Sequence, residues 1–130
     1  MGLILDTSFV ITAERDARRG RIGKAHEFLS AHASERFYIT FTVAGELACG
    51  QSASAHRDWE RLCRPYPILP WSKTIAWQYG ETYRSLAAAG HLIGGNDLWI
   101  AATALFHGFG VVTNNTEEFR RVPGVLVKGF

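Results

Sequence analysis

Three acidic residues could do chemistry together in this chain, because each lies beside apolar residues, where a charge is costly to bury. Asp6 directly follows the apolar residues 3–5. Glu46 lies in a mostly apolar stretch, and Asp97 opens a segment almost free of charge. Carboxylates that share one place repel each other unless a cation lies between them. Their oxygens suit Mg²⁺, which proteins commonly hold with one or two carboxylates, water and substrate phosphates. The three acids therefore predict a site for a hard divalent cation.

Two of these acids also have a structural alternative. Asp6, Thr7 and Ser8 are all residue types that cap helix N-termini by accepting backbone N–H bonds. Asp97 opens a predicted helix, where the helix dipole favours a negative charge. A purely structural role is a weaker alternative for Glu46, because a glutamate gains little among apolar neighbours. Each position alone leaves both interpretations open, but the three acids together favour a metal cluster over coincidence.

The composition is that of one globular domain over residues 1–130. The chain is 47% hydrophobic and 20% charged, and its five His and two Cys residues show no zinc-ligand spacing. Two cysteines are too few for a disulfide scaffold. No apolar run approaches the roughly 18 residues of a membrane span. Asp6 and Glu14 interrupt any signal peptide at the N-terminus. We therefore expect a cytoplasmic protein with no membrane partner.

The elements that must position the acids alternate between strands and helices. Short apolar or aromatic runs predict strands over residues 3–5, 37–39, 68–69, 111–113 and 125–127. Helical spacing predicts helices over residues 9–14, 22–33, 42–49, 54–64 and 72–89, and one that Asn96 caps and Gly108 ends. This order is typical of an α/β fold whose parallel sheet is covered on both faces. Sites in such sheets form at the carboxyl ends of strands, near which all three acids would lie.

The other charged residues have simpler interpretations. Five basic residues fall within ten positions and could meet phosphate or an acidic partner, or lie in a solvated loop: Arg15, Arg18, Arg19, Arg21 and Lys24. The formal net charge is only +2. Seven further acids are interpreted as parts of polar helix faces or loops: Glu14, Asp16, Glu27, Glu35, Asp58, Glu60 and Glu81.

Four segments in order resemble a PIN domain, in particular the small ribonuclease toxins of VapBC toxin–antitoxin systems. These segments are residues 3–8, 39–47, 93–104 and 112–124, and the resemblance covers nearly the whole chain. It implies a PIN-like three-layer α/β/α fold with a central, mostly parallel sheet of about five short strands.

The resemblance also implies a Mg²⁺- or Mn²⁺-dependent endoribonuclease that hydrolyses RNA phosphodiester bonds, as the toxin of a type II pair. Asp6 and Asp97 would hold the metal, and Glu46 would bind it or orient a metal-bound water. Supporting hydroxyls would come from Thr7, Ser8 and Thr113. Phosphate contacts would come from Arg15, Arg18, Arg19, Arg21, Lys24, Arg120 and Arg121.

One departure from the family pattern concerns residue 115. Many PIN domains have a fourth acid where this chain has Asn115. An amide offers an oxygen but no negative charge, so a second metal position stays open. Glu118 could substitute, and Glu117 is the less suitable stand-in, while a solvated pair of acids in a loop is the alternative for both. A non-catalytic PIN module that binds RNA or protein is therefore the rival hypothesis.

The resemblance further implies partners besides RNA. A cognate antitoxin would lay an amphipathic helix in an apolar groove and deliver a basic side chain to the acids. Candidate contributors to the groove are Trp59, Trp71, Trp77 and Trp99, although core packing is the simpler role for at least two of them. The assembly would be a homodimer or a toxin–antitoxin hetero-oligomer.

Overall fold

The computed structural model describes residues 1–50 and 53–130. Within these residues, five strands form one parallel sheet in the order β3-β2-β1-β4-β5. The strands are β1 (Gly2–Leu5), β2 (Arg36–Thr40), β3 (Ile68–Leu69), β4 (Gly110–Val112) and β5 (Val127–Lys128). The helices are α1 (Thr7–Arg18), α2 (Lys24–Ala31), α3 (Phe41–Ala48), α4 (His56–Cys63), α5 (Lys73–Ala89), α6 (Gly95–His107) and α7 (Thr116–Phe119).

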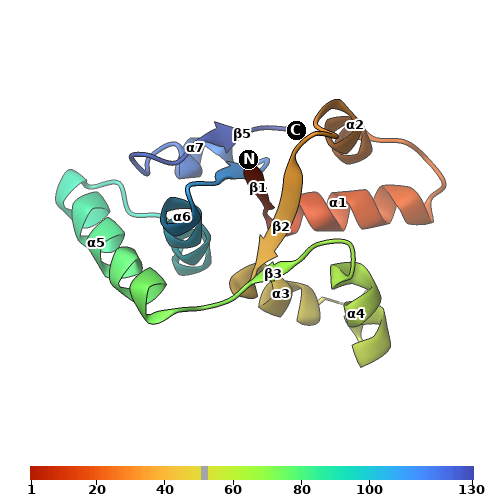
Figure 1. Cartoon of the computed structure of the whole chain (residues 1–130), viewed down its shortest axis with the longest axis horizontal. Helices are drawn as coiled ribbons and strands as arrows, with labels where there is room; N and C mark the ends of the chain where they lie inside the picture. The colour runs from red at the N-terminus through yellow and green to blue at the C-terminus, as the bar shows by residue number, and fades with distance from the viewer. Residues whose placement is uncertain (51–52) are drawn as a thin grey trace.

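Helices cover the sheet from both sides. In Figure 1, α5 and α6 lie on the left of the strands, and α1 and α2 lie on the right. This arrangement follows from the all-parallel pairing, because each crossover between parallel strands places a helix over a face of the sheet. The predicted three-layer α/β/α fold with a sheet of five short strands is confirmed.

Strand β1 lies at the centre of the sheet and sets the position of the residues that follow it. Its side chains are fully buried, with Ile4 and Leu5 at 0% exposure. It pairs with β2 on one side and with β4 on the other, where Leu5 is in register with Val112. The amide of Asp6 continues this pairing by donating to the Val112 carbonyl at 3.1 Å. The residues after β1 and after β4 therefore leave the sheet at the same edge.

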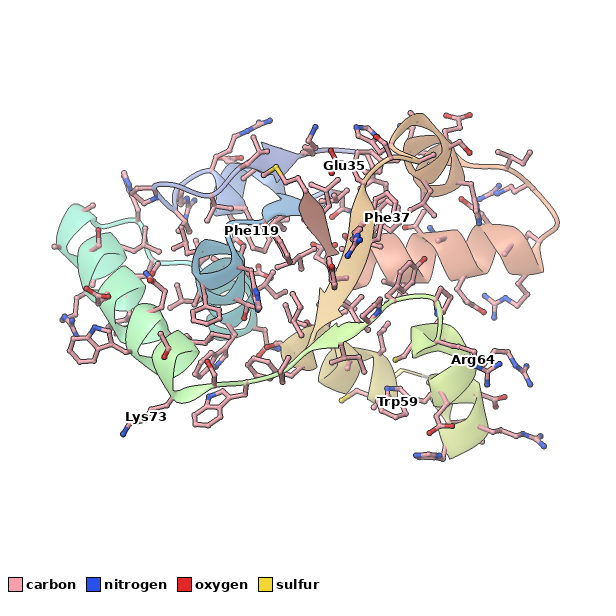
Figure 2. All side chains as sticks on the ribbon, viewed as in Figure 1. Glu35, Phe37, Trp59, Arg64, Lys73 and Phe119 are labelled. Atoms are coloured by element: carbon pink, nitrogen blue, oxygen red, sulfur yellow. The ribbon has the colours of Figure 1, made fainter. Side chains whose placement is uncertain are left out.

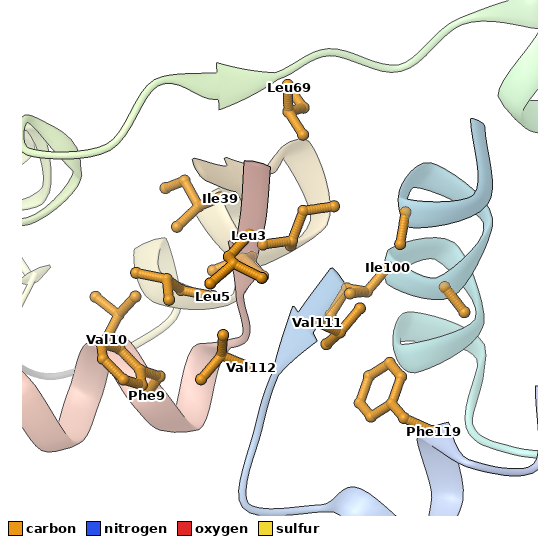
Figure 3. Packing of buried hydrophobic residues seen from close by; sticks show 14 of the residues in the cluster. Leu3, Leu5, Phe9, Val10, Ile39, Leu69, Ile100, Val111, Val112 and Phe119 are labelled. Carbon is orange, nitrogen blue, oxygen red and sulfur yellow. The ribbon is translucent and has the colours of Figure 1, made fainter. Parts of the chain in front are cut away.

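The hydrophobic core lies on both faces of the sheet. Figure 3 shows Phe9 and Val10 of α1 near Val112, while Val111 points toward α6 and α7. Neighbouring residues of a strand face opposite sides, so β4 contributes one valine to each half of the core. This double burial explains why the strands are continuously apolar.

Aromatic side chains hold helices to each other. Trp59 of α4 donates its indole N–H to the Ala44 carbonyl of α3 at 2.9 Å (Figure 2). Trp99 of α6 stacks on Tyr79 of α5, with ring centroids 4.1 Å apart. Two of the four tryptophans thus pack within the fold, as predicted. The other two, Trp71 and Trp77, are exposed.

Some element boundaries differ from the prediction. Helix α1 extends four residues further than predicted at its C-terminal end, where the positive charges of Arg15 and Arg18 interact favourably with the helix dipole. The prediction of Asn96 as a helix cap is wrong: α6 begins earlier because Gly94 is the cap residue and accepts the Leu98 N–H bond at 2.9 Å. Strand β5 lies later than predicted because the Val125 amide bonds to the Val122 carbonyl in a turn.

No helix in the described ranges 1–50 and 53–130 is long and apolar enough to cross a membrane.

Candidate functional site

Asp6 lies at the end of β1 and is almost fully buried, at 6% exposure. It caps α1, because its Oδ1 accepts the Phe9 backbone N–H at 3.2 Å. The same oxygen accepts the Ser8 hydroxyl at 2.5 Å, and Oδ2 accepts the Thr113 hydroxyl at 2.5 Å. The capping alternative is therefore confirmed, and capping does not remove Asp6 from its group of acids. Each bond fixes the carboxylate in one orientation.

Three strand ends supply the residues around Asp6. Strand β1 leads into α1, β2 leads into α3, and β4 leads into α7 through a short turn. Thr40 caps α3 by accepting the Val43 N–H at 3.1 Å. Thr113 follows β4, and its Oγ1 accepts the Asn115 N–H at 2.9 Å. Since parallel strands end at one edge of the sheet, these turns gather polar side chains from distant parts of the sequence.

Glu46 reaches this edge from α3 and is half-buried. Its Oε1 accepts the Thr7 hydroxyl at 2.9 Å, which joins α3 to the first residue of α1. All three predicted supporting hydroxyls thus donate to acids of the predicted cluster: Thr7 to Glu46, and Ser8 and Thr113 to Asp6.

Asp97 lies in the first turn of α6 and meets residues from the segment after β4. The Asn115 amide donates to Asp97 Oδ2 at 3.3 Å and to Glu118 Oε2 at 2.5 Å. Glu118 is half-buried on α7, whereas Glu117 is exposed. The structure therefore brings Asn115 and Glu118 to Asp97, and favours Glu118 over Glu117 as the fourth acid.

The acids act on one another electrostatically. The pKa of Asp97 is raised to about 6. Burial is the largest cause, followed by a hydrogen bond with Glu118 and its negative charge, and then by the charges of Asp6 and Glu46. Across the described parts of the chain, none of these four acids has a Lys, Arg or His partner within 4.0 Å. The carboxylate cluster, as we call Asp6, Glu46, Asp97 and Glu118, is thus a concentration of uncompensated negative charge.

The donor set of the carboxylate cluster fits a hard divalent cation. Its charged groups are all carboxylates, and Mg²⁺ prefers oxygen ligands. Within residues 1–50 and 53–130, no three His, Cys, Asp or Glu side chains are grouped closely enough to hold a metal ion as they stand. Mg²⁺ is commonly held by one or two carboxylates with water and substrate phosphates, so it does not need three protein ligands. The individual ligands Asp6, Glu46 and Asp97 stay a prediction.

The seven predicted phosphate-binding residues do not lie together. Three of them, Arg15, Arg21 and Lys24, line one cavity. Arg18 is 3.9 Å from Glu14 on α1, and Arg19 is exposed. Arg120 and Arg121 are exposed after α7, where the Arg121 guanidinium donates to the Leu92 carbonyl at 3.1 Å. Only part of the basic segment therefore forms a common surface.

The interpretation of Asp16 as part of a polar surface is wrong. Asp16 is only 4% exposed and accepts the Arg21 guanidinium Nε at 2.9 Å. A Cβ at Gly23 would lie 2.1 Å from its Oδ2, so any larger residue there would force the Asp16 carboxylate to move. The nearby glycine was the one signal of this close approach. Thr12 and Asn114 line the cavity that Arg15, Arg21 and Lys24 share, and no pattern in the sequence indicated either of them.

Known proteins share this fold and this order of segments. The sequence model of the PIN domain matches residues 3–125. The chain belongs to the PIN domain family. Ribonuclease VapC1 of Rickettsia felis is 30% identical to this PIN domain, and their alignment covers 98% of the chain and 95% of the relative.

Two solved structures resemble this PIN domain over its whole length. DNA-bound VapBC from Salmonella typhimurium matches with a TM-score of 0.83 and 26% identity, covering 99% of this chain and 98% of that one. VapBC2 from Rickettsia felis, bound to a DNA fragment from its promoter, has a TM-score of 0.83 and 23% identity, covering 100% and 99%. At that identity the second likeness shows the fold alone.

Proposed function

We propose that this PIN domain is a Mg²⁺- or Mn²⁺-dependent endoribonuclease that hydrolyses RNA phosphodiester bonds, and that it is the toxin of a toxin–antitoxin pair. The observation that carries this proposal is the carboxylate cluster, in which burial and the charges of three other acids raise the pKa of Asp97, and no cationic side chain of the described residues lies within 4.0 Å of the four acids. The relatives named Ribonuclease VapC support the reaction class.

The residues of the carboxylate cluster would divide the work as follows. Asp6 and Asp97 would hold the divalent ion, and Glu46 would bind it or orient its water. A divalent ion, when bound, lowers the pKa of a coordinated water and neutralises charge on a phosphate. Ser8 and Thr113 fix Asp6 in one orientation. Such hydrogen bonds to ligands keep the donor oxygens aimed at one point.

Neighbouring groups would hold the remaining acids. Thr7 fixes Glu46, and the amide of Asn115 lies between Asp97 and Glu118. Asn115 donates to both acids, whereas an acid at position 115 would repel both of them. We propose that Glu118, and not Asn115, supplies the fourth charge of the site.

The RNA substrate is expected to be single-stranded or looped. An A-form duplex has a deep, narrow major groove that side chains cannot read, whereas loops and single strands can enter a small cleft. Basic side chains near the carboxylate cluster would bind the backbone, so RNA binding should weaken as salt is raised.

An antitoxin partner is part of the proposal. VapBC-5 from Mycobacterium tuberculosis, a similar structure, belongs to a family of toxin–antitoxin systems. In this chain, a cavity of about 270 Å³ lies between α1, α2 and α4, with Val10, Leu62 and Tyr66 among its lining residues. Glu14, Asp58 and Arg61 line it as well, so its mixed lining suits an amphipathic helix that brings both apolar and charged side chains.

The first experiment removes the metal. Purified protein should cleave single-stranded RNA in Mg²⁺, lose this activity in excess EDTA, and regain it when Mg²⁺ or Mn²⁺ is restored, because the acids cannot act on a phosphate without a cation between them. Cleavage is followed by gel electrophoresis of end-labelled RNA.

Two results would contradict this proposal. Cleavage that continues unchanged in EDTA would show that no divalent ion takes part. RNA binding without cleavage in either metal would favour the rival, a non-catalytic PIN module.

A further inference from the structure

A second cavity, of about 540 Å³, has three basic residues in its lining. Its lining includes Arg15 of α1, Arg21 in the α1–α2 loop and Lys24 at the start of α2. Asn114, from the segment after β4, lines it as well. We call this the basic cavity. It joins parts of the chain that are 90 or more positions apart.

The basic cavity carries a net positive charge. Asp16 is its acidic lining residue and is already bound to Arg21, with Nε and Oδ1 2.9 Å apart. Arg15 and Lys24 remain, and within the described residues neither has a carboxylate within 4.0 Å. Among the residues that the structure describes, the buried Nε of Arg15 has no hydrogen-bond partner. The unpaired charges of Arg15 and Lys24 at the lining of this cavity favour an anion as its ligand.

The basic cavity is continuous with the carboxylate cluster along α1. Ser8, Thr12 and Arg15 are spaced at i, i+4 and i+7, which places them on one face of a helix. Ser8 donates to Asp6 in the cluster, while Thr12 and Arg15 line the cavity. The rise of the helix puts Arg15 roughly 10 Å along the axis from Ser8. A polar face therefore leads from one site to the other.

A second connection runs through the segment after β4. Asn114 lines the basic cavity. Its neighbours on either side contact the cluster, since Thr113 donates to Asp6 and Asn115 donates to Asp97. An extended ligand with more than one negative group can thus lie along both sites at once.

We propose that the basic cavity binds a phosphate of the RNA strand beside the phosphate that is cleaved, with Arg15 and Lys24 as its main contacts. This inference rests on the proposed ribonuclease function. Arginine binds phosphate with two parallel N–H bonds, and lysine binds it as a point charge. RNA is favoured over an acidic peptide because a single strand can place one phosphate in the cavity and another at the cluster.

The inference separates residues that the sequence grouped together. Arg15 and Lys24 bind RNA, and Arg21 holds the loop through Asp16 while presenting the rest of its guanidinium to the cavity. Arg18 and Arg19 belong to the same basic segment but do not line the cavity. The basic residues of this segment therefore contribute unequally to RNA binding.

The test measures RNA binding without metal, so that it does not depend on cleavage. A fluorescent single-stranded oligoribonucleotide is titrated in EDTA with the full chain and with Arg15→Gln and Lys24→Gln. Each variant should bind about tenfold more weakly at low salt, because it loses a charge-assisted contact with phosphate. The slope of log K against log salt should fall by about 0.7 for each lost contact to a single strand.

Two arginine variants serve as controls. Arg57→Gln removes a solvent-exposed charge on α4, outside the basic cavity, and should leave binding unchanged. Arg19→Gln removes a charge from the same basic segment and should weaken binding clearly less than Arg15→Gln does. Thermal unfolding checks that each variant is folded. If Arg15→Gln does not fold, Lys24→Gln still tests the inference.

The outcomes separate this inference from the proposed function. If Arg15→Gln and Lys24→Gln bind RNA as the wild type does, the inference is overturned, even where the wild type cleaves RNA in Mg²⁺. If both variants lose affinity and the wild type does not cleave, the phosphate contacts of Arg15 and Lys24 stand as an RNA-binding site, and the proposed function fails. Binding of a polyglutamate peptide that depends on Arg15, without such dependence for RNA, would also overturn the inference.

Discussion

At the scale of single residues, Asp97 shows the energetic cost of the carboxylate cluster. Its carboxyl group is half-buried and faces three other acids, which raises its pKa to about 6. Below the usual pKa of 3.8 the group is protonated in both the folded and the unfolded state, and no cost arises. As the pH rises from 3.8 to about 6, the unfolded state releases this proton while the folded state keeps it, so stability falls over this range and the full cost is present above it.

Asp97→Asn should therefore stabilise the metal-free protein in a pH-dependent way. We expect a gain of about 1–2 kcal/mol in the free energy of unfolding at about pH 7.5, after allowance for screening by water, and almost none at about pH 3. Urea denaturation in EDTA measures this gain. Asp58→Asn, on α4 beside Arg61 at 3.9 Å, is the control and should show no gain at the higher pH. An equal effect of Asp97→Asn at both pH values would contradict this explanation.

At the scale of elements, the site depends on strand ends that meet at one edge. Thr113 ties these ends together, since its hydroxyl donates to Asp6 after β1 and accepts from the backbone N–H of Asn115 before α7. Both Thr113 and Asp6 are buried, so neither lost bond is easily replaced by water. The turn after β4 is thus a structural part of the site as well as a source of side chains.

Thr113→Val keeps the shape of the side chain and removes this tie. We expect it to lower the free energy of unfolding by about 1–3 kcal/mol, because a buried carboxylate loses a hydroxyl donor. Thr103→Val is a matched control: Thr103 is equally buried, but its hydroxyl only donates to the Trp99 carbonyl within α6. Equal losses in the two variants, measured by urea denaturation, would show that Thr113 does not hold the strand ends together.

The elements also show what the sequence could predict. Continuous apolar runs and helical spacing gave all five strands and the main helices, because strong local patterns determine them. The cap of α6 was missed because Gly94 has no side chain that marks it. The burial of Asp16 was missed because it depends on the return of the loop at Gly23, which local spacing does not encode.

At the scale of the whole molecule, the fold brings four distant segments to one edge of a parallel sheet. The three predicted acids are near enough for Asp6 and Glu46 to raise the pKa of Asp97, and the predicted hydroxyls bond to them. The sequence could not show that Glu118 joins them through Asn115, or that Arg15 and Lys24 share a cavity with Asn114. These relations depend on the sheet order and on side-chain orientation.

The most direct measurement is single-turnover cleavage of RNA in Mg²⁺ by the wild type, Asp6→Asn and Asp97→Asn. Asn caps a helix about as well as Asp, so Asp6→Asn removes the charge and keeps the cap of α1. Both variants should cleave at least about 100-fold more slowly because the divalent ion loses a ligand. Asp58→Asn, outside the carboxylate cluster, should cleave at the wild-type rate. Wild-type cleavage by Asp6→Asn or Asp97→Asn would contradict the assignment of the cluster as the active site.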